Sequence, residues 1–158
     1  MKRLLAVVAV LASVVIMALA ALPLSAGANS DKRFVLAIRG NLTGDTTGAG
    51  TFSVDGAIND AGTFDVPFAA TPAKNNCYAI TADWTFTAPD GSFTFHGSGR
   101  SCSTSPTDAR AISDFTFKLS NGTGAYAGIA GNGSAVGVTD FTDGTFTTVF
   151  EGRARGLH

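Results

Sequence analysis

Two side chains in this sequence could together carry acid–base chemistry, Asp83 and His96. A carboxylate next to an imidazole can orient the ring as a general base. In the strand pattern described below, both residues face away from the apolar side that carries Trp84 and Phe95, so we expect them on the outer surface. A surface charge pair is the simpler interpretation, and Arg100 on the same face extends a polar stripe.

A glycine-rich stretch from Asn121 to Gly137 is the second place where chemistry could reside, because such loops can hold phosphate groups. A dinucleotide-binding fingerprint needs the spacing G-x-G-x-x-G before a helix. Here Gly128 follows Gly122-x-Gly124 one residue too late, and the sequence continues with a strand-like pattern. We therefore predict no phosphate site. The glycines fit the bulges and close approaches of a bent strand pair, anchored by Tyr126.

Other catalytic and metal-binding patterns are missing from the sequence. The histidines, His96 and His158, do not form a metal-ligand cluster with other side chains. Glu151 is the only glutamate, so no pair of carboxylates for glycoside hydrolysis can be assigned. Asp140 and Asp143 lack the ligand spacing of a calcium loop. We predict no catalytic residue, no metal site and no cofactor.

The N-terminus predicts export. Lys2 and Arg3 precede an apolar run over residues 4–22, and the small residues Ala26-Gly27-Ala28 follow. This arrangement is typical of a secretory signal peptide. We predict a signal peptide over residues 1–28 and a single mature domain over residues 29–158, secreted from the cell. The alternative is a membrane anchor that is not cleaved.

The charge of the mature chain argues against a nucleic-acid partner. Of 11 lysines and arginines, 9 remain after removal of Lys2 and Arg3, against 12 acidic residues, so the net charge is −3. Nucleic-acid-binding proteins carry basic patches that neutralise phosphates. We therefore expect no nucleic-acid partner and, once the signal is cleaved, no membrane partner.

Period-two alternation of apolar and polar residues predicts β-strands after residue 29. Phe34, Leu36 and Ile38 share one face of such a segment, and similar runs recur along the chain. One apolar and one polar face per strand is typical of an antiparallel sheet that covers a core. Eight strands can close into an up-and-down barrel, which is our prediction; a two-sheet β-sandwich is the alternative. The predicted strands are 33–40, 49–58, 62–70, 77–88, 92–102, 110–120, 133–139 and 145–155.

A hairpin around Pro89-Asp90 fixes the register of two of these strands. If Ala88 faces Gly91, apolar side chains meet apolar ones along the whole hairpin, which sets the register when one face is buried. The resulting partners are Phe86 with Phe93, Trp84 with Phe95, Asp83 with His96, and Cys77 with Cys102. We predict a disulfide between Cys77 and Cys102, which lie in the exported part of the chain.

The glycine-rich stretch also carries a family resemblance. Gly122-Thr123-Gly124-Ala125-Tyr126-Ala127-Gly128, followed by Gly131, resembles the G-x-G-x-[FY]-x-G-x-x-G stretch of the allene oxide cyclase and dirigent-like barrel proteins. The resemblance implies an eight-stranded antiparallel barrel that holds a small hydrophobic molecule, and assembly as a trimer. The polar functional residues of that superfamily have no match here, so no catalytic residue is carried over.

The aromatic interior is the remaining candidate for function. An eight-stranded barrel has room for its own side chains or for one small ligand. The predicted ligand-lining residues are Tyr78, Trp84, Phe86, Phe93, Phe95 and Phe117. Three functions stay open: a secreted, non-catalytic protein that holds a small apolar ligand, a cyclase or isomerase acting on a hydrophobic molecule, and a structural or surface interaction module.

Overall fold

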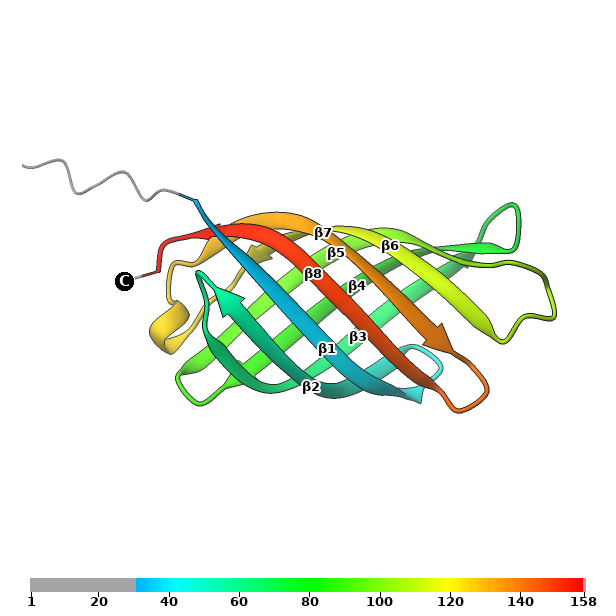
Figure 1. Ribbon diagram of the computed structural model, residues 1–158, viewed down its shortest axis with the longest axis horizontal. Helices are drawn as coiled ribbons and strands as arrows, with labels where there is room; N and C mark the ends of the chain where they lie inside the picture. The colour runs from blue at the N-terminus through cyan, green and yellow to red at the C-terminus, as the bar shows by residue number, and fades with distance from the viewer. Residues whose placement is uncertain (1–30, 158) are drawn as a thin grey trace, which may run out of the picture.

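The computed structural model describes residues 31–157 and shows a closed antiparallel β-barrel, in which successive strands pair and β8 pairs with β1 (Figure 1). The strands are β1 (Lys32–Gly44), β2 (Thr47–Gly56), β3 (Asp60–Pro72), β4 (Cys77–Ala88), β5 (Gly91–Ser103), β6 (Arg110–Ser120), β7 (Ala130–Asp140) and β8 (Thr145–Arg155). The predicted barrel is confirmed, and the sandwich alternative is wrong. The predicted signal peptide, residues 1–28, lies outside the described residues, as does His158.

β1 shows why these segments form strands. Its side chains alternate, with Phe34, Leu36 and Ile38 buried and Val35 exposed between them. The same alternation recurs in the other strands, so each contributes its inward face to one apolar core. Closure of the barrel pairs both edges of each described strand, so none of β1 to β8 is an edge strand.

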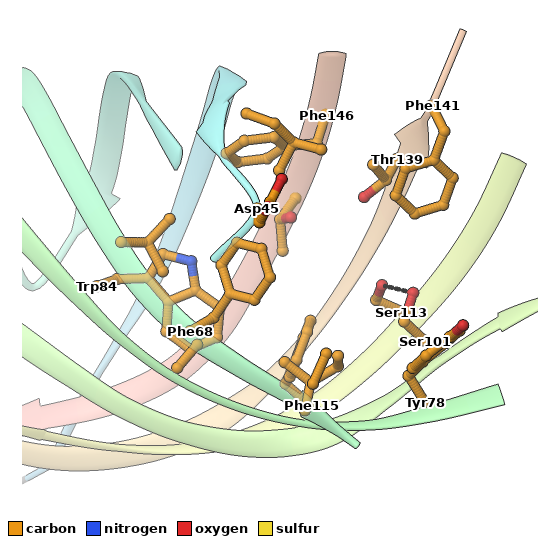
Figure 2. Close-up of a pocket in the computed structure, with 16 residues that line it drawn as sticks. Asp45, Phe68, Tyr78, Trp84, Ser101, Ser113, Phe115, Thr139, Phe141 and Phe146 are labelled. Atoms are coloured by element: carbon orange, nitrogen blue, oxygen red, sulfur yellow. Dashed lines mark hydrogen bonds between the residues drawn. The ribbon is translucent and has the colours of Figure 1, made fainter. Parts of the chain in front are cut away.

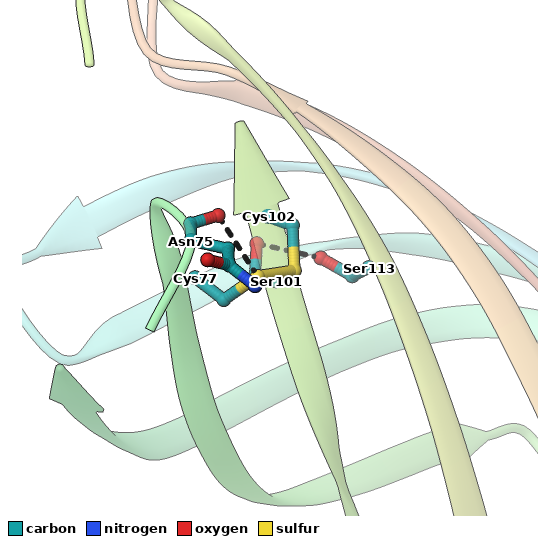
Figure 3. The surroundings of a disulfide bond; sticks show 5 residues. All are labelled: Asn75, Cys77, Ser101, Cys102 and Ser113. Atoms are coloured by element: carbon teal, nitrogen blue, oxygen red, sulfur yellow. Dashed lines mark hydrogen bonds between the residues drawn. A yellow bond between two sulfur atoms is a disulfide. The ribbon is translucent and has the colours of Figure 1, made fainter. Parts of the chain in front are cut away.

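The hairpin of β4 and β5 has the predicted register. Ala88 lies opposite Gly91, and the pairing continues without a shift to Cys77 and Cys102. These two cysteines form a disulfide with an S–S distance of 2.06 Å (Figure 3). The predicted disulfide is thus confirmed.

The two ends of the barrel differ. The end that carries the β2–β3, β4–β5 and β6–β7 connections is called the closed end here (Figure 1). The β6–β7 connection contains a short 3-10 turn, η1 (Gly124–Tyr126), and buries Tyr126 and Ile129 against the core. The opposite end carries the β1–β2, β3–β4, β5–β6 and β7–β8 turns and is called the open end.

Contacts hold the β6–β7 connection across the closed end. The Tyr126 hydroxyl donates a hydrogen bond to the Asp60 carboxylate at the start of β3. The backbone N–H of Ala125 donates to the Asp90 carbonyl oxygen on the β4–β5 turn, at 2.9 Å. Tyr126 is the anchor that we expected. The predicted bent strand pair over 121–137 is wrong in its first part, however, because the chain is a loop until β7 begins at Ala130.

Phenylalanine rings fill the closed half of the interior. Phe95 stacks on Phe117 with ring centroids 4.4 Å apart, and Phe86 on Phe93 at 5.1 Å. Inward-facing glycines provide the space for these rings: a Cβ added to Gly133 would lie 2.7 Å from the Phe117 ring. This pairing of small and large side chains is what a narrow barrel needs to pack without voids.

Candidate functional site

The open half of the barrel is hollow. A cavity of about 380 Å³ enters from the open end, and its walls are largely apolar (Figure 2). Trp84 forms its floor: the indole lines the cavity on one side and packs edge-on against the fully buried Phe150 ring on the other, with ring centroids 5.2 Å apart. The apolar wall residues include Val66, Phe68, Ile80, Ala82, Phe115 and Phe146.

The volume of the cavity sets the size of a molecule that it can hold. A cavity of about 150 Å³ lined by apolar side chains is large enough for one benzene molecule. The 380 Å³ observed here therefore fits a molecule of about two rings. This volume also lies within the range of small-molecule pockets, roughly 300–1,000 Å³.

The interior holds a row of hydroxyl groups near the mouth. Tyr78, Ser101, Ser113 and Thr148 come from β4, β5, β6 and β8, and the strand register places them on one line around the wall, with Gly137 of β7 between the last two. All four line the cavity, as does Thr139 of β7. We call these four residues the hydroxyl row.

The serine pair is the best-defined part of the hydroxyl row. The Ser113 hydroxyl donates to Ser101 Oγ at 2.9 Å (Figure 2). Ser113 and Thr148 are 6% and 7% exposed, and within residues 31–157 they are the buried polar residues. Because one hydroxyl proton of the pair is used between the serines, the other remains available to a bound molecule.

Negative charge surrounds the mouth. Asp45, on the β1–β2 turn, is the one charged residue among the described residues that line the cavity. The other charged residues on the turns and strand ends at this end are Asp108, Asp140, Asp143, Lys74 and Arg110. Arg110 is already paired with Asp140, Nε to Oδ2 at 3.0 Å. Acidic groups therefore outnumber basic ones around the entrance.

Hydrogen bonds keep carboxylates of this rim ionised. The backbone N–H of Thr142 is the main cause that lowers the pKa of Asp140, and Arg110 adds to it. The hydroxyl and backbone N–H of Thr145 lower the pKa of Asp143. Both groups are therefore negative throughout the neutral range, and an anionic molecule approaching the mouth meets like charge.

The six predicted lining residues divide between the two halves. Tyr78 and Trp84 line the cavity. Four others lie deeper, buried against one another in the closed half: Phe86, Phe93, Phe95 and Phe117. A filled core and a ligand cavity were alternatives for the whole interior; the structure has a filled core in the closed half and an open cavity in the other half. Ser101, Ser113 and Thr148 were not predicted; their signal in the sequence is a hydroxyl at an inward position of an otherwise apolar strand face.

Asp83 and His96 do meet, but on the outer wall. His96 Nδ1 lies 2.6 Å from Asp83 Oδ1. His96 Nε2 lies 3.2 Å from Nδ2, the side-chain nitrogen of Asn121. Both ring nitrogens are thus engaged, which leaves neither for a substrate. Together with Pro67 and Thr81, the pair borders a second hollow, on β3–β5. This geometry supports the interpretation as a surface pair that holds the start of the β6–β7 connection.

Neither a metal centre nor a membrane-spanning helix is found in the described part of the chain. Within residues 31–157, no group of three or more His, Cys, Asp or Glu side chains could hold a metal ion. The same residues contain no helix that is long and apolar enough to cross a membrane. Comparison with known proteins gives no match: no family model, curated protein or solved structure matches the chain. The relation to the allene oxide cyclase and dirigent-like barrels stays a prediction.

Proposed function

We propose that this protein is a secreted, non-catalytic carrier or receptor that binds one small apolar molecule in the open half of its barrel. The observation that carries the proposal is the apolar cavity of about 380 Å³ above the Trp84 floor, in the open half of the barrel. Apolar surface on both partners leaves water when such a cavity is occupied, and this drives binding.

The chemistry of the lining favours binding over catalysis. Asp45 and Tyr78 are the titratable groups among the described lining residues, and both are exposed at the mouth. A cyclase or isomerase that works by general acid–base catalysis needs a proton donor or acceptor beside the reacting atoms. The deeper wall offers such a substrate carbon, hydroxyl groups and the Trp84 indole N–H, none of which is a general acid or base in the neutral range.

The disulfide supports the proposed location. Disulfides persist in oxidising compartments such as the extracellular space and are rare in the reducing cytosol. The Cys77–Cys102 bond lies on the outer wall at the open end, beside the inward-facing Ser101 (Figure 3). Together with the predicted signal peptide, it is the basis for proposing secretion.

Titration with the neutral naphthalene dye prodan tests the proposal. Trp84 is the only tryptophan in the chain, so energy transfer from it to the dye reports a dye molecule at the cavity. We expect transfer in the wild-type protein and its loss in Ala82→Phe, whose added ring occupies much of the cavity. Thr81→Phe, at the next position but on the outer wall, is the matched control and should bind normally.

Two results would contradict the proposal. One is equal dye binding by Ala82→Phe and wild type when circular dichroism shows that both are folded. The other is a wild-type protein that binds neither prodan nor any neutral apolar compound and carries none in native mass spectra after purification. The same spectra determine the oligomeric state, and thereby test the trimer that the family resemblance implies.

A further inference from the structure

The hydroxyl row is not explained by the stability of the barrel. Ser113 and Thr148 are the buried members of the row; the other buried inward positions of the described strands are apolar, and a hydroxyl placed there loses its hydrogen bonds to water. Replacing both partners of a buried hydrogen bond by apolar groups of similar shape is often neutral or stabilising. Alanines at positions 101 and 113 would therefore give a barrel of similar stability, so the presence of hydroxyls at these positions needs another explanation.

Gly137 keeps the row open to the cavity. It lies between Ser113 and Thr148 in the strand register, and a Cβ added to it would lie 2.4 Å from Thr148 Oγ1. Any side chain at this position would cover the Thr148 hydroxyl. With glycine there, the hydroxyls of Ser113 and Thr148 border the same free space on the wall.

Building on the proposed function, we propose that the ligand is an uncharged molecule of about two rings that carries one acceptor oxygen, a ketone, ether or alcohol, and that the Ser101–Ser113 pair binds this oxygen. The hydroxyl proton that the serine pair does not use internally is the donor. The Thr148 hydroxyl, on the other side of Gly137, lies next to the same part of the cavity wall. An apolar cavity with a few convergent polar groups is the arrangement that fixes the orientation of a small ligand.

The charges exclude the ionised alternatives. A carboxylate inside the cavity would have no Lys or Arg among the described lining residues to compensate its lost hydration, and it would approach past Asp45 and the acidic rim. An ammonium group would have no buried carboxylate partner in that lining. Only an uncharged polar group matches hydroxyls in an apolar wall.

A matched series of ligands tests the inference: tetralin, 1-tetralone and tetralin-1-carboxylate, each measured by displacement of prodan. These molecules share two rings and differ in one substituent. We expect wild type to bind 1-tetralone about fivefold more tightly than tetralin, the equivalent of one net hydrogen bond. The carboxylate should bind at least about tenfold more weakly than the ketone.

Variants assign the preference to the serine pair. In Ser101→Ala/Ser113→Ala we expect the ketone and the hydrocarbon to bind equally, while Ser98→Ala, on the outward face of β5, keeps the fivefold difference. If the double variant does not fold, Ser101→Ala alone should reduce the preference. Tetralin that binds as tightly as the ketone to wild type, or a preference that survives in the folded serine variants, overturns the inference and leaves the proposed function intact. Failure of all three compounds and of prodan to bind overturns both.

Discussion

Substitution of Gly97 by alanine should destabilise the protein, although alanine normally stabilises a strand relative to glycine by roughly 0.5–1 kcal/mol. Gly97 faces the interior of β5, and an added Cβ would lie 2.6 Å from Trp84 Cζ3. The indole cannot move aside freely, because Phe115 and Phe150 pack edge-on against it, each with ring centroids 5.2 Å away. Overpacking of this kind costs about 1–3 kcal/mol.

A double-mutant cycle with Trp84→Phe isolates this contact. Phenylalanine lacks the distal indole atoms, Cζ3 and Cη2, that an alanine at Gly97 would meet. We therefore expect the double variant to be less destabilised than the sum of the single variants, by about 1–2 kcal/mol. Urea unfolding followed by far-UV circular dichroism gives the four free energies of unfolding that the cycle needs.

Gly99→Ala provides the matched control. A Cβ there would lie 1.8 Å from the Asp114 backbone oxygen, a clash that a smaller ring at Trp84 does not relieve. Gly99→Ala should thus be destabilising and additive with Trp84→Phe. Additivity of Gly97→Ala with Trp84→Phe to within about 0.5 kcal/mol would refute the reasoning, because it would mean that the indole does not rest on Gly97.

Two further perturbations act away from the cavity. The disulfide links residues 25 positions apart, and the chain-entropy estimate of its stabilisation is about 3.5 kcal/mol. Cys77→Ala/Cys102→Ala should therefore lower the free energy of unfolding, measured in urea, by about that amount. An unchanged urea midpoint would contradict this estimate. Tyr126→Phe removes the hydrogen bond to Asp60 and should cost about 1.5–3 kcal/mol. Burial and Asp60 raise the pKa of Tyr126 in the folded state, so its stabilisation is complete below the unfolded-state pKa of about 10 and declines as the pH rises above it. The free energy of unfolding of wild type should accordingly fall more steeply above pH 10 than that of Tyr126→Phe, and parallel curves would contradict this origin.

The fold could be predicted largely because its determinants are local. Period-two alternation located the strands, and the turn at Pro89-Asp90 together with facing aromatic residues set the β4–β5 register as far as the cysteines. The β6–β7 connection could not be predicted in this way. Its path depends on the hydrogen bond from Tyr126 to Asp60, 66 residues earlier, and nothing in the glycine pattern specifies that partner.

The cavity and the hydroxyl row escaped prediction for a related reason. Ser101, Ser113 and Thr148 fall on one line only when the registers of β5–β6, β6–β7 and β7–β8 are known together. Whether the interior is filled depends on all the inward side chains at one level of the barrel. Twelve phenylalanines in the sequence do not reveal how many of them share the same half.

Trp84 connects the stability of this barrel to the proposed binding. Its indole closes the packed half and forms the floor of the cavity, so a ligand that occupies the cavity contacts a ring on which the core also depends. A ligand at 100 times its dissociation constant stabilises the folded state by about 2.7 kcal/mol, which is comparable to the cost expected for Gly97→Ala. The Cβ added at Gly97 would meet the same indole, however, so the substitution strains the side chain that forms the floor of the cavity. Ligand binding and this substitution therefore both act on the position of the Trp84 indole. A ligand should stabilise Gly97→Ala less than it stabilises wild type.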